Sequence, residues 1–468
     1  MSMTPVILWT DALVFLLVAV IVAALFYARG KEHLLAPWRH VVRSRMGVAS
    51  MVVLAVYVCI GLLDSIHYRD ALPDQGNGEV HYSGEVLSVL DALMGPIKNN
   101  VETTYSAPFA AYAYSRETVT LPNGEQERIL PRLKFGGAHL EDPEQELWPD
   151  VLSNSVIAFG QGVILWLLAV VLVTTWLSRR ASGSFLAAAR LIARGQTEIP
   201  WRIVFLVLFF VIVITSWCMQ LGPKYHILGT DKVGQDVFYM AMKSIRTGLL
   251  IGTLTTLIML PFAVMLGITA GYLRGWVDDV VQYLYTTLSS IPGVLLIAAA
   301  VLMMQVYIAN HPEIFDTEAA RADMRLLFLC IILGITSWTG LCRMLRGEAM
   351  KLREMDYIEA SVAFGVGKAK IITRHILPNV MHIVMIAVVI DFSGLVLAEA
   401  VLSYVGVGVD PSTHSWGNMI NSARLEMARE PMVWWSLMAA FIFMFVLVLA
   451  ANLFSDVVRD AFDPRLRK

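Results

Sequence analysis

The sequence predicts an all-α, polytopic membrane protein, and three observations lead to this fold class. Hydrophobic residues make up 57% of the 468 positions, and charged residues only 16%, against about 25% in a typical soluble protein. Several apolar runs are long and carry no charge, for example 248–273 and 280–312. Lipid offers the backbone no hydrogen-bonding partner, so runs of this kind must be helical where they cross a bilayer.

Nine segments are long enough to cross a membrane. A spanning helix needs about 20 largely apolar residues, because each residue adds only about 1.5 Å along the axis. The predicted spans are 6–27, 47–66, 155–177, 201–219, 247–271, 280–307, 326–343, 380–402 and 434–455. The segment 326–343 is the weakest, because it is short.

The positions of Lys and Arg predict the orientation, since these residues accumulate in cytoplasmic segments. With the C-terminus placed inside, the inside segments hold 22 of the 36 Lys and Arg residues, counting Arg343 at the edge. These segments are 28–46, 178–202, 272–279, 344–379 and 456–468. Nine spans then place the N-terminus outside.

The first predicted helix has no Lys or Arg before it and five just after it. That polarity is opposite to the polarity of a cleavable signal peptide, so we expect this helix to remain as an anchor. After the second span, residues 67–150 form one long polar segment that we place outside the membrane.

The longest inside loop between spans, 344–379, carries structure of its own. The expected elements are a helix over 347–364, a turn at Gly365 and Gly367, a second helix over 368–376, and a stop at Pro378. The plain interpretation of such a basic, amphipathic segment is an interfacial helix that lies on anionic lipid.

The order of residues within this loop favours a more specific role, because 359–378 resembles the EAA loop of ABC-importer permeases. The matching residues are Glu359, Ala360, Gly365, Leu377 and Pro378. Ser361 replaces the second alanine of the family pattern, and His375 occupies its isoleucine position. The resemblance implies that the loop inserts into a cleft of an ATPase subunit and carries the closure of that subunit into the membrane.

A second match lies at 226–237, H-I-L-G-T-D-K-V-G-Q-D-V. It resembles the signature of the second permease in oligopeptide, dipeptide and nickel importers, with Gln235 in place of the usual Arg. Its signature residues are Gly229, Thr230, Asp231, Gly234 and Asp236. Residues 229–231 predict a turn and a helix N-cap, so we expect this motif to position structure and to take no part in chemistry.

Further matches to the same family follow at 399–409, 415–419 and 456–466, so the resemblance covers about 201–468. It implies two domains: a permease core of six spans over 201–468, and an N-terminal extension over 1–200 with three spans and the 67–150 segment. The role of the extension stays open between docking a substrate-binding protein, bracing a partner permease and plain stabilisation.

The resemblance also implies the partners and the mechanism. A second homologous permease would share the pathway, two ATPase subunits would hold ATP and Mg²⁺, and an extracytoplasmic binding protein would deliver substrate. The setting would be the bacterial inner membrane, with alternating access in this chain and no catalysis. Di- or oligopeptides are the expected substrates, with nickel or sugars as alternatives within the same role.

Two other classes of membrane protein remain alternatives to this interpretation. A secondary transporter driven by an ion gradient would show inverted repeats and interrupted spans, and neither is clear in the sequence. A membrane-embedded enzyme would need a polar constellation within the spans, where Asp391 and Glu399 are thin support. These two carboxylates are possible pathway residues, because charge within a span usually faces a cavity or a partner.

Several sites are missing from the sequence. There is no G-x-x-x-x-G-K-[ST] loop, so nucleotide must bind to another chain. No His or Cys cluster has the spacing of metal ligands, and we predict no metal site, no catalytic residue and no cofactor in this chain. The formal net charge of −2 gives no reason to expect nucleic acid.

Overall fold

The computed structural model describes residues 4–72, 82–120, 126–180, 184–311 and 317–462. Within these ranges, nine helices are long and apolar enough to cross a membrane. This finding confirms the all-α, polytopic fold class. The spans are α1 (Trp9–Ala28), α3 (Arg45–Asp64), α6 (Pro143–Arg180), α8 (Trp201–Leu221), α9 (Val237–Leu273), α11 (Gly293–Asn310), α12 with α13 (Glu318–Ser337, Thr339–Arg353), α15 to α16 (Lys368–Val405) and α18 (Trp435–Phe462).

Shorter elements lie mainly at the two ends of the bundle. The helices are α2 (Glu32–Arg43), α4 (Val89–Leu93), α5 (Gly95–Lys98), α7 (Phe185–Arg194), α10 (Trp276–Ser290), α14 (Asp356–Ala363) and α17 (Trp416–Glu426). The strands are β1 (Thr4–Val6), β2 (His67–Arg69), β3 (Leu87–Ser88), β4 (Glu117–Thr120) and β5 (Gln126–Ile129). Strands β1, β2 and β3 form an antiparallel sheet in that order, and β4 pairs with β5.

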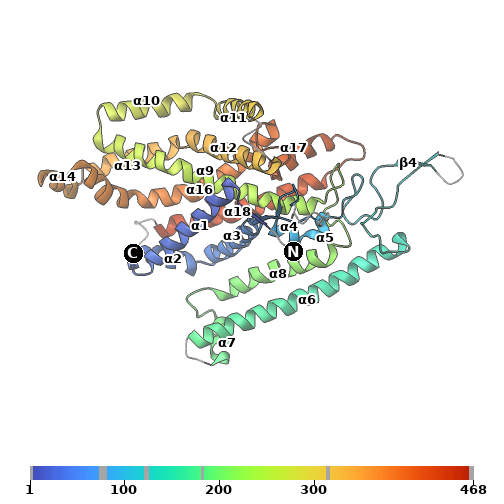
Figure 1. Cartoon of the computed structure of the whole chain (residues 1–468). Helices are drawn as coiled ribbons and strands as arrows, with labels where there is room; N and C mark the ends of the chain where they lie inside the picture. Colours follow the sequence, from blue (N-terminus) through green and yellow to red (C-terminus); the bar gives the residue numbers. More distant parts are fainter. Residues whose placement is uncertain (1–3, 73–81, 121–125, 181–183, 312–316, 463–468) are drawn as a thin grey trace.

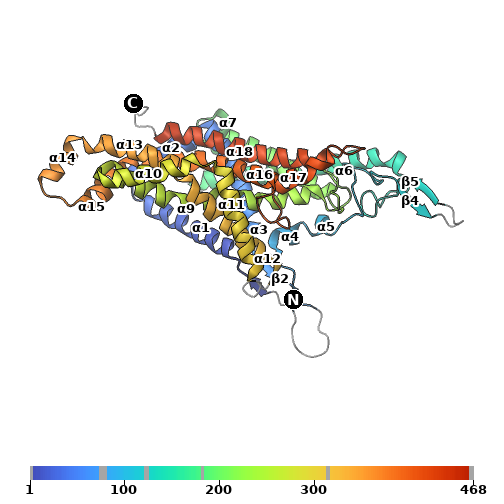
Figure 2. The same ribbon diagram turned by 90° about the horizontal axis from the view of Figure 1, so that it is seen from above.

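The elongated bundle has two distinct ends (Figure 1). We call the end that carries α14 and the last described residue the loop end. We call the opposite end, where β4 lies, the cap end, and the described residues between α3 and α6 the cap. Figure 2 shows the same separation from above, with α14 and the β4–β5 hairpin at opposite extremes.

The structure corrects two predicted spans. The single span 280–307 is wrong, because the chain breaks at Ile291 and Pro292 between α10 and α11. Proline removes a backbone N–H and disfavours helical backbone in the residue before it, and Ile291 is extended with ψ 131°. The short span 326–343 belongs to a much longer helical stretch, Glu318–Arg353, whose charged ends extend beyond the apolar run.

Helix α9 is the central element of the bundle. It packs against α3, α12, α13, α16 and α18, and glycines allow the closest of these approaches. A Cβ at Gly271 would lie 2.4 Å from the carbonyl oxygen of Arg346, and one at Gly267 would lie 2.7 Å from that of Cys342. Both contacts are with α13, so small residues one turn apart let the two backbones meet.

The packing does not divide the chain at residue 200. Helix α3, which the sequence assigned to the extension, lies within the bundle: Tyr57 donates a hydrogen bond to the Phe443 carbonyl of α18 (2.9 Å). Helix α8, assigned to the core, pairs with α6 in a hairpin at the side of the bundle (Figure 1). Its buried residues Cys218 and Leu221 belong to a separate apolar cluster. A long insertion separates α3 from α9 along the chain, so local sequence patterns do not show that α3 packs in the bundle and that α8 packs at its side.

Candidate functional sites at the two ends of the bundle

The loop between α13 and α16 is a compact hairpin of short helices at the loop end. The predicted single helix over 347–364 is wrong, because the helix breaks at Glu354 and Met355 and α14 begins at Asp356. Met355 is extended, with ψ 138°. Glu354 forms an ion pair with Arg274 at the end of α9, which ties this break to the bundle.

The predicted glycine turn is confirmed. Gly365 has a φ of 74°, a left-handed conformation that glycine adopts without steric cost. The N–H of Val366 bonds to the Ser361 carbonyl (3.1 Å) and the N–H of Gly365 to the Val362 carbonyl (2.9 Å). This is a Schellman ending, so α14 stops in a defined geometry. Beside it, Phe364 is 87% exposed and touches little of its own chain.

The second arm differs from its prediction at Pro378. The proline does not stop the helix, because α15 (Lys368–Ile371) continues through a π-helical turn, η2 (Ile372–Ile376), into α16 (Leu377–Val405). The N–H of Leu377 bonds to the Ile372 carbonyl. This wider turn changes the hydrogen-bond pattern where a proline ring would otherwise clash with the preceding turn.

The two arms are joined to each other and to the bundle. Asn379 donates to the hydroxyl of Tyr357 (3.1 Å) and to the carbonyl of His375 (2.8 Å). Ile358 and Ile371, one on each arm, are fully buried in an apolar cluster that also contains residues of α9, α10, α13 and α16. The structure therefore brings the predicted coupling residues together in one rigid element: Glu359, Ala360, Ser361 and Gly365 on the first arm, and His375, Leu377 and Pro378 on the second.

Helix α13 connects this element to α10. The guanidinium of Arg346 donates to both carboxylate oxygens of Asp278 (2.5 and 2.7 Å), and these bonds hold the pKa of Asp278 below its usual range. Arg353 donates to the carbonyl of Tyr272 at the end of α9 (3.1 Å). The loop is therefore linked by polar contacts to α9, α10 and α13 together.

The signature turn lies at the cap end, at the start of α9. The N-cap of α9 is Asp236, whose carboxylate accepts from the Tyr239 N–H (3.1 Å), so the predicted cap at 229–231 is wrong. Asp231 instead closes the turn by accepting from the N–H groups of Val233 and Gln235 (3.0 and 2.8 Å). Thr230 lies inside the turn, accepts from the Ser106 N–H (2.7 Å) and donates to the Thr104 carbonyl (2.9 Å).

A buried ionic group joins this turn to the cap. His226 lies between Asp236 (2.8 Å) and Glu102 (3.3 Å). Burial alone would lower the pKa of His226, but the hydrogen bonds to the two carboxylates raise it to about 9. The Glu102 carboxylate also accepts from three backbone N–H groups of the cap, at 134–136. Sequence reasoning missed Glu102, because the residues around it match no motif.

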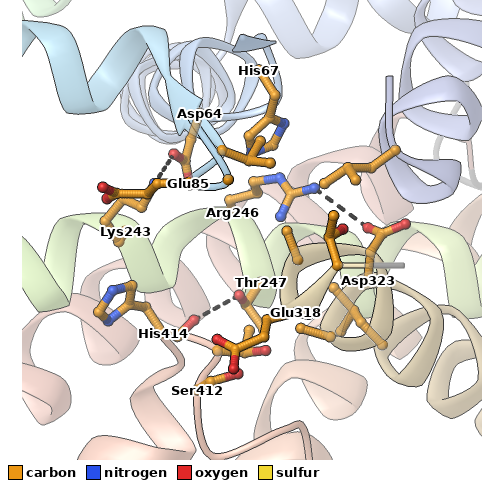
Figure 3. Close-up of a pocket in the computed structure, with 18 residues that line it drawn as sticks. Asp64, His67, Glu85, Lys243, Arg246, Thr247, Glu318, Asp323, Ser412 and His414 are labelled. Carbon is orange, nitrogen blue, oxygen red and sulfur yellow. Dashed lines mark hydrogen bonds and ion pairs between the residues drawn. The ribbon is translucent and has the colours of Figure 1, made fainter. Parts of the chain in front are cut away.

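A charged cavity of about 700 Å³ lies nearby, between α3, α9, α12 and the loop before α17. Figure 3 shows Lys243 of α9 turned toward Asp64 of α3, and Arg246 turned toward Asp323 of α12. Lys243 lies 2.7 Å from Asp64 and 3.0 Å from Asp91. Burial opposes ionisation of Asp91, but Lys243 and further hydrogen bonds lower its pKa to about 2.

Arg246 is the second buried cation of this region. It lies 2.6 Å from Asp11 of α1 and 3.8 Å from Asp323, and Thr10 donates to Asp323. Both α9 cations are therefore neutralised chiefly by carboxylates from the first 100 residues. Neither cation belongs to a recognisable motif, although charge near an apolar run is a signal for such a site.

The two possible pathway carboxylates have different surroundings. Glu399 is 2% exposed and accepts from the Ser403 hydroxyl (2.7 Å), beside the first residues of α17. Asp391 is half-buried and forms no hydrogen bond or ion pair within the described ranges. The two groups share α16 but do not meet, and their pathway role stays a prediction.

Two further expectations concern the end of the chain and metal binding. Residues Asp456–Asp460 of the closing pattern lie on α18, whereas its last part, 463–466, is outside the described residues. Among the residues described, no three His, Cys, Asp or Glu side chains gather as they would around a metal ion.

Comparison with known proteins identifies the family. The family model for the binding-protein-dependent transport system inner membrane component matches residues 263–468, which include the whole loop. The chain is 31% identical over 249 residues to the glutathione transport system permease of Pectobacterium atrosepticum, covering 53% of this chain and 75% of that protein. It is 32% identical over 246 residues to the oligopeptide transport system permease of Mycobacterium tuberculosis, covering 53% and 78%.

A third relative bears on the N-terminal part. The dipeptide transport system permease of Bacillus subtilis is 24% identical over 325 residues, covering 69% of this chain and 86% of that protein. This match is longer than 201–468, so it extends into the first 200 residues. The chain therefore belongs to the inner-membrane permeases of binding-protein-dependent ABC importers, among the C-type subunits of the peptide branch.

Proposed function

We propose that this chain is one of two permease subunits of an ATP-driven importer of di- or oligopeptides. The family depends in general on ATPase and binding-protein partners. For this chain we infer a second homologous permease, two ATPase subunits that hold ATP and Mg²⁺ at the loop end, and a binding protein at the cap end. The relatives named for oligopeptides, dipeptides and glutathione support the peptide assignment.

The loop between α13 and α16 carries the proposal. It presents Phe364 and Val362 to the surroundings, 87% and 55% exposed, while Ile358 and Ile371 anchor it in the bundle. An exposed apolar tip on a rigid, well-anchored base is suited to bind a cleft and to transmit its movement. We infer that ATPase closure displaces this tip, and that α9, α10 and α13 carry the displacement toward the pathway.

The test is uptake of a labelled dipeptide by proteoliposomes that contain the complete complex. A large apolar side chain at the centre of an interface often contributes 2 kcal/mol or more, so F364A should lower ATP-driven uptake by about tenfold or more. The matched control is F26A, an exposed phenylalanine of α1 (62%) outside the loop, which should leave uptake unchanged.

The outcomes separate the alternatives. If F364A transports like F26A, the loop does not couple. If uptake persists after ATP depletion and collapses with the ion gradient, the protein is a secondary transporter. Accumulation of nickel or a sugar without competition by peptides would leave the ABC role intact and overturn the peptide assignment.

The orientation has its own test. We infer that the loop end is cytoplasmic and the cap end external, with the N-terminus outside. Ser361, on the first arm of the loop, is replaced by cysteine in a Cys59→Ser background, because Cys59 is the exposed native thiol among those described. A membrane-impermeant maleimide should label this cysteine in inside-out vesicles and leave it unlabelled in intact cells, and the reverse pattern would invert the topology.

A further inference from the structure

A second pocket, of about 370 Å³, lies at the loop end, where the α6–α8 hairpin meets the start of α3. Four arginines line it, and they come from two segments of the chain: Arg43 and Arg45 from one, and Arg194 and Arg202 from the other. Glu198 is the single carboxylate in this lining. The family match at 263–468 does not include the residues that line this pocket. The proposed transport function does not involve the pocket either.

The pocket keeps an excess of positive charge. Glu198 pairs with Arg43 (2.8 Å), so one arginine is neutralised. Arg202 donates from Nε to the Ile192 carbonyl (3.1 Å), which holds its guanidinium in place without removing its charge. Arg45 and Arg194 form no ion pair within the described ranges. Three exposed arginines without an acidic partner therefore line one pocket, and an anion that bridges them would be attracted by all three.

The surroundings place the pocket at the depth of lipid headgroups. Span α6 ends at Arg180, α8 begins at Trp201 and α3 begins at Arg45, so spans leave the hydrocarbon at this level. Helix α7 lies beside the pocket and exposes Phe185, Leu186 and Leu191, as expected for a helix in the membrane interface. Trp201 contributes to the lining, and tryptophan is enriched at this depth.

We propose that this pocket binds the phosphate of an anionic phospholipid in the leaflet at the loop end, and that the bound lipid holds the α6–α8 hairpin against α3. Arginine matches the geometry of phosphate oxygens with paired N–H donors. Basic pockets between spans are typical sites for anionic headgroups. The assignment depends on the span ends and the arginines, and it holds whatever cargo the importer carries.

The experiment measures lipid retained by the full-length protein after detergent extraction, by native mass spectrometry with phosphatidylglycerol or phosphatidylcholine added. The test variant is R45Q/R194Q, since neither side chain has an ionic partner whose loss would unfold the protein. The matched control is R180Q/R190Q, which removes the same charge from the same end but from residues outside the pocket lining.

We expect wild type and R180Q/R190Q to retain phosphatidylglycerol in preference to phosphatidylcholine. The R45Q/R194Q variant should bind phosphatidylglycerol about thirtyfold more weakly, from the usual contribution of two basic residues to anionic lipid binding. If both double variants retain the same amount of phosphatidylglycerol, the lipid is attracted by basic residues in general. That result would overturn the proposal of a specific site in this pocket. Displacement of the lipid by millimolar inorganic phosphate would assign the pocket to a soluble anion. Loss of the ATPase subunits from R45Q/R194Q, with lipid retained, would assign it to a protein partner.

Discussion

Gly234 shows at the scale of a single residue why the signature turn requires glycine. Its φ is 77°, and a Cβ on it would lie 1.9 Å from the carbonyl oxygen of Glu102. The cap backbone therefore packs directly onto this glycine. Gly229 has the same role one turn earlier, with a Cβ position 2.5 Å from the Ser106 carbonyl. The motif thus serves as the surface on which the cap rests.

This contact predicts the effect of G234A on stability. A left-handed alanine costs about 1 kcal/mol in backbone strain, and displacement of the cap adds to this cost. The control is G406A, because Gly406 is also left-handed (φ 86°, ψ 16°) but has no neighbour within 4 Å of its Cβ position. Thermal unfolding of the purified protein should show a clearly larger loss for G234A, together with faster proteolysis of the cap. Equal losses of thermal stability in the two variants would mean that the cap backbone does not pack on Gly234.

The His226 group predicts a pH dependence for the same contact. Its folded pKa of about 9 lies above the ordinary 6.5, so its stabilisation is complete below about pH 6.5 and is lost as pH rises through 9. Glu102 has the opposite sign: hydrogen bonds outweigh burial and lower its pKa from 4.5 to about 2, so its contribution is complete above about pH 4.5 and is lost as pH falls through 2. Hydrogen exchange at the Glu102 amide, whose N–H bonds to the Gly234 carbonyl (3.0 Å), should accelerate between pH 7 and 9.5 beyond the intrinsic rate. An H226Q variant should lose this extra dependence, and an identical profile in both proteins would contradict the assignment.

At the scale of elements, two cations on α9 organise the helices around them. Lys243 and Arg246 are three residues apart, so they lie on neighbouring positions of one face. Lys243 binds α3 and α4, and Arg246 binds α1 and α12. Apolar matching alone says little about which helices meet within a bilayer, whereas buried ion pairs specify partners. The position of α1 beside α12 follows from this pairing.

The pairing predicts the cost of removing one partner. R246Q removes the guanidinium from Asp11, whose side chain is 1% exposed and which then keeps only the His67 ring at 2.8 Å. Breaking a buried pair in this way typically costs about 3–5 kcal/mol. The double variant R246Q/D11N should recover part of that loss, because the carboxylate closest to the missing guanidinium is then neutral as well. K351Q, at an exposed pair on α13 (76%), should have little effect. Thermal unfolding in detergent checks this order, and a double variant no more stable than R246Q would refute the pairing.

At the scale of the whole molecule, α9 connects the two candidate sites. Its first turn carries the signature turn and the cap, and its last turns lie against α13 and the loop, where Arg353 and Gly271 make contact. This single helix of 37 residues therefore spans the distance between the two sites, and under the proposed function it is the element that would carry a displacement between them. The α6–α8 hairpin lies beside this route, so the proposed lipid would steady the hairpin without blocking the movement of the bundle.

Local patterns in the sequence were sufficient to predict the spans, the position of the loop between α13 and α16, and the family. Insertion into lipid depends on the composition of each segment, so hydropathy identified every span, although Pro292 and the charged ends of Glu318–Arg353 changed two boundaries. The glycine turn at Gly365 was also predictable, since its conformation depends on adjacent residues. The π-helical turn before Pro378 was not, because a proline at this position can either end a helix or be accommodated by a wider turn, and the choice is made where η2 packs against α9 and α13.

The tertiary structure alone decided which helices form the bundle and what holds the cap. Tyr57 and Phe443 are separated by 386 residues, and Lys243 and Asp64 by 179. Their contacts depend on the route of the intervening chain, which no local pattern records. The sequence by itself therefore determined the class of protein, through composition and spacing, and it predicted the position of the loop between α13 and α16. Folding placed α3 in the bundle, α8 at its side and the carboxylates of the first 100 residues beside the cations of α9, because buried polar and charged groups need partners that only the folded chain brings together.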